Sequence, residues 1–218
     1  MTSSTRDLYP FIALEGCDGV GKSTIRQLLV GFLNGRGMPT SAVGQHSWLD
    51  PFAARLICRA RDMKEQYSAD EIAQAYRRDR LRHIENNIIE RLSSCSVVAD
   101  RSQISDLVYR EALYGHSFEE NWAQQISRGD VRLPDLIVYV RVDVQLAYQR
   151  VLSRGRIARH YERPADMGRI IEIYDRILVE RVPPGMPRVV FFDNTESGVQ
   201  AKVRDQLVDQ LLSFVGRC

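Results

Sequence analysis

The sequence of 218 residues has few cysteines, almost no net charge and no long apolar stretch. Its four cysteines are scattered without metal-ligand spacing, which fits a reducing cytoplasm better than a disulfide framework. No apolar run reaches the roughly 18 residues of a transmembrane helix, and the N-terminus lacks the apolar core of a signal peptide. Lys and Arg total 30 against 28 for Asp and Glu, so charge does not indicate a protein that coats nucleic acid. We therefore expect a cytoplasmic protein with no membrane contact and no nucleic-acid partner.

The composition that is present is that of an ordinary globular protein, with 44% hydrophobic and 27% charged residues. This length and composition predict one folded domain over residues 1–218. Strand-sized apolar segments alternate with helix-sized amphipathic segments. Strands are expected at 11–15, 40–44, 96–100, 136–142 and 189–192. Helices are expected at 22–33, 51–63, 69–92, 105–114, 118–127, 144–153, 165–182 and 199–214. The alternation predicts an α/β fold, in which a five-stranded parallel sheet carries helices on both faces.

A phosphate-binding pattern follows the first expected strand. The segment from Gly16 to Ser23, GCDGVGKS, matches G-x-x-x-x-G-K-[ST] in full and opens a helix. Glycines allow a tight turn whose N–H groups face phosphate oxygens, and the positive end of the helix dipole faces the same anion. Lys22 would supply charge for the terminal phosphates, and the Ser23 hydroxyl would ligate Mg²⁺.

Two further residues of this loop, Asp18 and Cys17, allow predictions. Asp18 is either a turn-favouring carboxylate or an acceptor of a hydrogen bond from a sugar hydroxyl. A carboxylate beside bound phosphates is unfavourable without a partner, which favours the functional interpretation. Cys17 lies near a helix N-terminus, which predicts a lowered thiol pKa and sensitivity to oxidation.

The third strand ends in Asp100 and Arg101, at the edge of a parallel sheet where ligands bind. Asp100 would orient Mg²⁺ and its water ligands. In the long helix of 69–92, Tyr76 and Arg80 lie one turn apart on one face. Tyr76 would stack on a base and Arg80 would donate to the base or a phosphate, unless this face is only a solvated arginine surface.

Residues 154–164, RGRIARHYERP, are rich in arginine and poor in apolar residues. Like charges repel one another until an anion gathers them, which predicts a lid that closes over phosphates. A solvated basic loop is the alternative.

The chain resembles the thymidylate kinase family of nucleoside monophosphate kinases, in motifs that keep their order from Phe11 to about Phe214. The motifs are EGCDGVGKST at 15–24, YRRDRLRH at 76–83, DR at 100–101 with Ser105, Asp106 and Tyr109, LPDLIVYV at 133–140, and RGR at 154–156 with Glu162. The resemblance implies a P-loop nucleotide kinase fold with an arginine-bearing lid, ATP and Mg²⁺ as cofactors, a small nucleotide substrate and a homodimer.

The resemblance also implies roles for individual residues. The ATP site would comprise Gly16, Asp18, Gly19, Val20, Gly21, Lys22, Ser23, Thr24 and Arg154, with Ser23 and Asp100 on Mg²⁺. The acceptor site would comprise Asp18, Tyr76, Arg80, Arg101, Ser105, Asp106 and Tyr109. Asp18 would meet the 3′-hydroxyl, Arg80 the base edge and Arg101 the acceptor phosphate. Catalysis would depend on Lys22, Arg101, Asp18 and a lid arginine, Arg159.

One segment departs from the family pattern. Where the family usually has R-E-P-G after the second strand, this chain has QHSWLD at 45–50, so a contact to the acceptor is lost or remade by His46 or Arg55. Asp106 stands where some members carry Asn. We expect a kinase for a deoxynucleoside monophosphate resembling dTMP. The alternatives are a kinase of the same scaffold for a modified nucleotide, a nucleoside or a base-borne hydroxyl, and a regulator that binds ATP without transferring phosphate.

Overall fold

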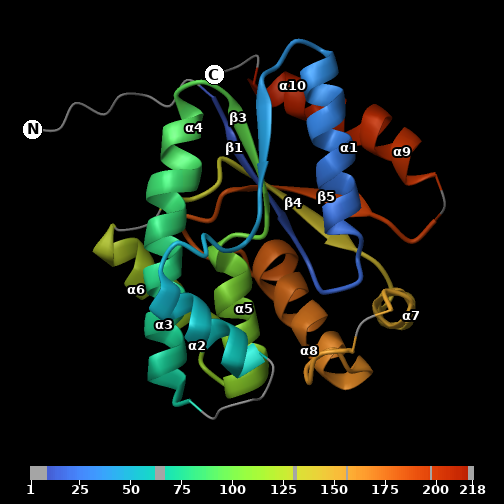
Figure 1. The fold of residues 1–218 in the computed structure, drawn as a ribbon. Coiled ribbons are helices and arrows are strands. Elements are labelled where there is room, and N and C mark those ends of the chain that lie inside the picture. Colours follow the sequence, from blue (N-terminus) through green and yellow to red (C-terminus); the bar gives the residue numbers. More distant parts are fainter. Residues whose placement is uncertain (1–8, 62–66, 130–131, 156, 197, 216–218) are drawn as a thin grey trace, which may run out of the picture.

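A computed structural model of the chain describes residues 9–61, 67–129, 132–155, 157–196 and 198–215 (Figure 1). Its centre is one parallel sheet of five strands in the order β2-β3-β1-β4-β5. The strands are β1 (Phe11–Glu15), β2 (Thr40–Val43), β3 (Ser96–Asp100), β4 (Leu136–Arg141) and β5 (Arg188–Asp193). The α/β class, the number of strands and their parallel direction are as the sequence predicts.

The central strands are buried on both faces, as their unbroken apolar sequences require. All five residues of β1 are buried. In β1, Ala13 pairs with Ala99 of β3 on one side and with Ile137 of β4 on the other. The carboxyl ends of β1 and β3 therefore lie side by side, which brings the phosphate-binding loop next to Asp100 and Arg101.

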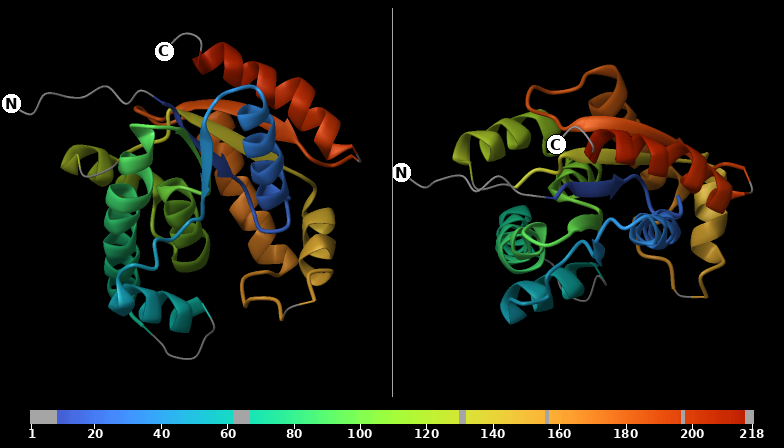
Figure 2. Two further views of the ribbon diagram at one scale, coloured as in Figure 1. Left: turned by 45° about the horizontal axis from the view of Figure 1, so that its top comes forward. Right: turned by 90° about the horizontal axis from the view of Figure 1, so that it is seen from above.

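Helices cover the sheet on both sides (Figures 1 and 2). They are α1 (Lys22–Gly35), α2 (Pro51–Arg61), α3 (Ala69–His83), α4 (Glu90–Leu92), α5 (Gln103–Tyr114), α6 (Phe118–Arg128), α7 (Val144–Leu152), α8 (Pro164–Asp175), α9 (Val199–Lys202) and α10 (Asp209–Val215). Helix α1 packs beside the C-terminal helix, whereas α5 and α8 pack against each other.

Three expected helices contain wider, π-helical turns. Residues Ile84–Ile89 join α3 to α4, so the expected helix of 69–92 is continuous. Residues Val203–Val208 join α9 to α10 in the same way. Residues Arg176–Glu180 extend α8, which ends two residues before the expected position, Val182. The expected end of the second helix, Met63, lies outside the described residues.

Ser68 begins the long helix with a capping box. Its hydroxyl accepts a hydrogen bond from the Glu71 amide, and the Glu71 carboxylate accepts one from the Ser68 amide. This cap fixes the start of α3, which packs against α2 through an apolar cluster and also contacts α5.

Among the described residues, the helices are too short or too polar to serve as a membrane span.

Candidate active site

The loop between β1 and α1 approaches other backbone segments more closely than a side chain would allow. A Cβ atom on Gly19 would lie 2.1 Å from the carbonyl oxygen of Ala147, and one on Gly16 would lie 2.3 Å from that of Val140. Gly19 also has φ of 83°, in the left-handed region. The loop therefore packs directly against the backbone of β4 and α7.

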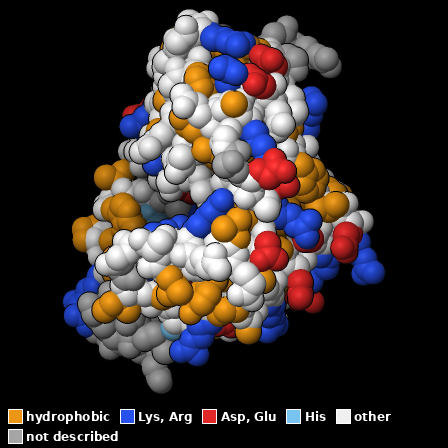
Figure 3. Space-filling view, turned by 90° about the vertical axis from the view of Figure 1, so that its right-hand side faces the viewer, with side chains coloured by type: hydrophobic (Ala, Val, Ile, Leu, Met, Phe, Trp, Pro, Cys, Tyr) orange, Lys and Arg blue, Asp and Glu red, His pale blue; other side chains and the backbone are white. Residues whose placement is uncertain are grey.

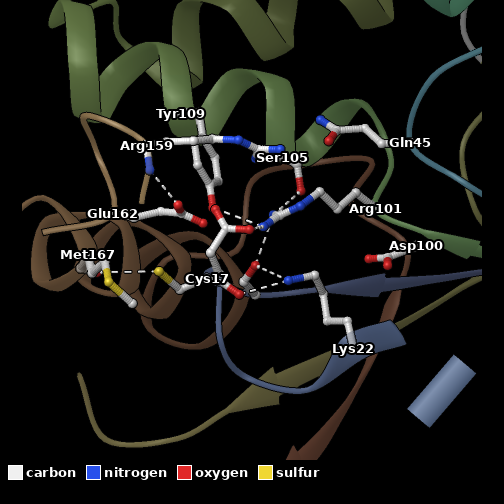
Figure 4. A network of polar contacts seen from close by, with 12 residues as sticks. Cys17, Lys22, Gln45, Asp100, Arg101, Ser105, Tyr109, Arg159, Glu162 and Met167 are labelled. Atoms are coloured by element: carbon white, nitrogen blue, oxygen red, sulfur yellow. Dashed lines mark hydrogen bonds and ion pairs between the residues drawn. The ribbon is translucent and has the colours of Figure 1, made fainter. Parts of the chain in front are cut away.

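Lys22 is buried at the first turn of α1, with 6% of its surface exposed. Its ammonium donates to the carbonyl oxygens of Gly16 (3.0 Å) and Cys17 (2.7 Å), so the side chain curls back over its own loop (Figure 4). Burial and the nearby charge of Arg101 lower the Lys22 pKa to about 8, against the opposing pull of nearby carboxylates. An anion in the loop would raise this pKa and favour the charged ammonium.

Ser23 and Asp100 form the expected pair of oxygen ligands. The Ser23 hydroxyl donates to the Asp100 carboxylate over 2.7 Å, across 77 residues of sequence. Both line the same pocket as Lys22. A hydroxyl and a carboxylate beside a phosphate-binding loop are the donors that Mg²⁺ takes together with phosphate oxygens and water, so the site fits this ion.

Arg101 is the centre of a buried polar network (Figure 4). It has φ of 80°, a conformation that is uncommon for a residue with a side chain. Its guanidinium donates to Asp18 (3.1 Å), the Tyr109 hydroxyl (2.9 Å), the Ser105 hydroxyl (3.0 Å) and the carbonyl oxygen of Gly16 (2.9 Å). The Tyr109 hydroxyl in turn donates to Asp18 over 2.8 Å.

The charges of Arg101 and Lys22 hold the pKa of the Asp18 carboxyl well below its usual range, although burial opposes this. Asp18 is therefore ionised and partnered before any ligand binds. The partner that the sequence argument required for this carboxylate is Arg101.

The carboxylate of Glu15 anchors this network, a role that the sequence did not predict. It is completely buried, and its carboxylate accepts hydrogen bonds from Ser102, Ser105 and Tyr174. Burial raises its pKa, against the hydrogen bonds and the charge of Arg101. Tyr174 comes from α8 and gave no local signal, since only the packing of α8 against α5 brings it here.

Two pockets meet at this network, and the space-filling view shows a hollow edged by Lys and Arg side chains (Figure 3). The phosphate pocket is lined by Gly21, Lys22, Ser23, Thr24, Asp100 and Arg154. The second pocket, called the acceptor pocket after the ligand that the sequence predicts for it, is lined by Tyr76, Ser105, Asp106, Tyr109, Arg110 and Arg159. The residues that line both are Asp18, Gln45, His46, Arg61 and Arg101. Of the other expected loop residues, Gly16, Gly19 and Val20 belong to the turn between β1 and α1 and do not themselves line the phosphate pocket.

Arg80 lies behind the acceptor pocket. Its guanidinium contacts the Asp106 carboxylate over 3.2 Å, and Gln45 donates to the other oxygen of Asp106 over 3.1 Å. Burial raises the pKa of Asp106, while the charge of Arg80 lowers it. In this arrangement Asp106 and Tyr76 face the pocket, and Arg80 orients Asp106.

The segment that departs from the family pattern forms a turn around Asp79. His46 lies at both pockets, whereas Arg55 is exposed on α2 and lines neither of them. Of the two candidates for remaking a contact to the acceptor, the structure places His46 at the site.

The expected lid lies between α7 and α8. Arg159 donates to the Tyr161 hydroxyl over 2.9 Å, and the Arg159 amide donates to the buried Glu162 carboxylate over 2.6 Å. Arg154 lies 3.8 Å from Glu162. The lid is therefore tied to a carboxylate while its arginines reach both pockets. Arg156 lies outside the described residues.

The expectation for Cys17 is wrong. Its thiol is buried, with 1% exposed, and contacts the carbonyl oxygen of Met167 over 3.8 Å. Burial and the adjacent Asp18 charge raise the Cys17 pKa to about 12, which outweighs the helix N-terminus and the nearby cations. We expect an unreactive thiol.

Comparison with known proteins points to one family. A family model described as thymidylate kinase matches residues 14–183. A "Probable thymidylate kinase" of Archaeoglobus fulgidus is 26% identical over 148 residues, 67% of this chain and 71% of that protein. A "Probable thymidylate kinase" of Methanospirillum hungatei is 26% identical over 174 residues, 78% of this chain and 80% of that protein. A "Thymidylate kinase" of Leptospira borgpetersenii is 25% identical over 171 residues, 77% and 80% respectively.

Proposed function

The chain belongs to the thymidylate kinase family and is an ATP-dependent phosphotransferase, and we propose that it phosphorylates a deoxynucleoside monophosphate, with dTMP as the acceptor. The observation that carries this proposal is the meeting of two pockets at Asp18 and Arg101. A donor pocket around Lys22 and an acceptor pocket around Tyr76 then share the place where the phosphoryl group crosses.

Different residues contribute to different parts of phosphoryl transfer. An oxygen of the acceptor phosphate attacks the γ-phosphorus, the bond to the β,γ-bridging oxygen breaks, and ADP leaves. Lys22 and Arg159 stabilise the charge on the transferring group, and Arg101 holds Asp18 against the acceptor sugar. Ser23 and Asp100 would hold Mg²⁺, which supplies charge neutralisation at the β- and γ-phosphates when bound. The segment of 154–164 would exclude water, which would otherwise accept the phosphoryl group.

Asp106 supports a keto pyrimidine as the base. Its carboxylate faces the acceptor pocket beside Tyr76, and hydrogen bonds from Gln45 and Arg80 fix its orientation. A carboxylate accepts hydrogen bonds only, so it selects a base with a ring N–H at that edge. Thymine and uracil have such an N3–H, whereas neutral cytosine does not.

A coupled assay of ADP release over all nucleoside monophosphates tests this proposal. We expect dTMP or dUMP to give the highest kcat/KM. Asp106→Asn should reduce the preference over dCMP by about tenfold or more, because the amide also donates to cytosine N3. No release above background with any monophosphate would contradict the proposal.

A second candidate acceptor is a hydroxyl on a nucleoside, on a modified nucleotide or on a base. The turn at 45–50 favours it, because it places His46, a residue able to accept a proton, where the pockets meet. Nucleosides in the same assay separate the two candidates. A homodimer is a further part of the proposal, and analytical ultracentrifugation tests it.

A further inference from the structure

The turn at residues 46–48 is built around one buried carboxylate, that of Asp79. Asp79 is 1% exposed and accepts hydrogen bonds from the Ser47 hydroxyl (2.7 Å) and from the amides of Ser47 (3.2 Å) and Trp48 (3.0 Å). These bonds hold Trp48 at φ of 56°, in the left-handed region. Burial raises the pKa of Asp79, but the hydrogen bond with His46, together with these bonds, lowers it below its ordinary value. Asp79 is therefore a fixed anion.

The remaining partner of this anion is His46, whose Nδ1 lies 2.9 Å from Asp79. A carboxylate only accepts, so Nδ1 carries a proton. The ring is packed between Trp48 (centroids 4.6 Å apart) and Tyr76 (5.5 Å). Within the described parts of the chain, no hydrogen bond reaches the other ring nitrogen, Nε2, and the ring lines both pockets. The atom offered to a ligand is thus Nε2.

One of the two arginines that line both pockets with His46, Arg101, is already used by the protein. Arg101 donates to Asp18, Tyr109, Ser105 and the Gly16 carbonyl, as described above. An acceptor phosphate needs a donor whose hydrogen is not committed, and a protonated Nε2 meets this need. The hydrogen bond from Nδ1 to Asp79 orients the ring, and this bond is charge-assisted when the ring is an imidazolium.

Other charged groups around the ring act in both directions. Asp106 faces His46 from α5 and favours its protonated form. His83 from α3 opposes it. Arg61 and Arg101 line the pockets and also oppose it, whereas Asp18 favours it. A bound phosphate adds negative charge on the Nε2 side, so binding and protonation support each other.

We propose that the His46 imidazolium, oriented by Asp79, binds the phosphate of the acceptor nucleotide through Nε2–H, which makes acceptor binding dependent on pH. The inference rests on the proposed function and assigns the anion contact of its acceptor site. His46 is the binding residue and Asp79 is a positioning residue.

The direction of the pH effect separates this role from that of a base. An imidazolium that binds phosphate lowers the KM for the acceptor at low pH, and the advantage disappears as pH rises through its pKa. A base that takes a proton from a hydroxyl needs a neutral Nε2 and would instead lower kcat at low pH. Phosphate binding therefore predicts a KM that rises at high pH, whereas a base predicts a kcat that falls at low pH.

The first test compares wild-type protein with His46→Gln, using dTMP from about pH 6 to about pH 9. The ratio of the two KM values cancels the titration of dTMP itself. We expect His46→Gln to raise the KM by about 10- to 100-fold at the acid end and by less than about threefold at the alkaline end, with kcat nearly constant. A KM ratio that does not change with pH, or that is close to one, would overturn the proposal. The proposal would also fail if His46→Gln lost kcat and the kcat of the wild type fell at low pH.

The second test does not depend on turnover. The histidine ring resonances of the labelled full-length protein are titrated with and without dTMP, and His46→Gln assigns the signal. We expect dTMP to raise the pH midpoint of His46 and to leave that of His116 unchanged, with His116→Gln as the matched control. Asp79→Asn should lower the His46 midpoint. If that variant does not fold, the effect of dTMP on the His46 midpoint of the wild-type protein still decides the proposal.

The outcomes distinguish the two proposals. If monophosphates are phosphorylated but dTMP leaves the His46 midpoint unchanged, the proposed function stands and this inference fails. If dTMP shifts His46 but no monophosphate is phosphorylated, the inference stands and the proposed function fails.

Discussion

Asp18 and Arg101 form a buried ion pair, 3.1 Å between oxygen and nitrogen, that joins the phosphate-binding loop to the end of β3. The Tyr109 hydroxyl closes the pair into a triangle, at 2.8 Å from Asp18 and 2.9 Å from Arg101. Three elements are thereby fixed at the meeting point of the pockets. Because these three side chains are held in place before the substrate binds, phosphoryl transfer requires less reorganisation of the site.

Asp18→Asn should destabilise the fold at neutral pH by about 1–3 kcal/mol, because it leaves the buried Arg101 charge without its counter-ion. The Asp18 pKa is lowered from its ordinary value of 3.8, so its contribution is complete above that value and is lost as pH falls toward the lowered pKa. Urea unfolding of both proteins should show a difference that shrinks below about pH 4. Tyr109→Phe, which keeps the ion pair and removes one hydrogen bond to Asp18, is the comparison and should show a smaller pH-dependent difference.

Lys22 should take up a proton when ATP binds at alkaline pH. Its pKa is lowered to about 8 in the free protein, and bound phosphates would raise it. Above about pH 8 the affinity should therefore fall by up to about tenfold per pH unit, with uptake of a proton on binding. Calorimetry in buffers of different ionisation enthalpy measures this uptake. Lys22→Arg keeps the charge at all these pH values, and equal uptake in that variant would contradict the assignment.

How much the sequence predicts depends on the range of the interactions. The phosphate-binding loop and the strands are local patterns, so Gly16 to Ser23 and the β1 segment were placed by sequence alone. The position of Arg80 depends on a partner in another helix, Asp106, which spacing along one helix does not reveal. Cys17 was mispredicted because a helix N-terminus is visible in sequence, whereas burial against Met167 is not. Tyr174 lacked any local signal, and Glu15 belonged to the EGCDGVGKST motif without a role assigned to it.

Asp79 is an intermediate case. Its place on the same helix face as Tyr76 is visible in sequence. Its contact with the turn at 46–48 follows only from tertiary structure, because the two segments lie more than 30 residues apart in sequence. Functional interpretation of this helix face therefore required the structure.

Ser23→Ala should raise the Mg²⁺ concentration needed for half-maximal activity by about tenfold, because the hydroxyl is one of the two candidate protein ligands. The Ser23 side chain is exposed, so thermal unfolding without nucleotide should change little. Titration of activity with Mg²⁺ at saturating ATP measures the shift. Removal of the metal with a chelator should abolish activity and leave the circular dichroism of the protein unchanged. An unaltered Mg²⁺ requirement in Ser23→Ala would refute the assignment.

Gly19→Ala should inactivate the enzyme, because a Cβ there would lie 2.1 Å from the carbonyl oxygen of Ala147 and would push the loop away from α7. A displacement of this size costs about 100-fold or more in kcat/KM when it misplaces phosphate-binding amides. Gly37→Ala is the matched control, since Gly37 has φ of 80° and no atom within 4 Å of the added carbon. Both variants carry the strain of a left-handed alanine, about 1 kcal/mol, and should be destabilised by it. Only Gly19→Ala should also lose activity. Equal activity in the two variants, measured in the coupled assay at saturating ATP, would show that the close approach at Gly19 does not position the loop.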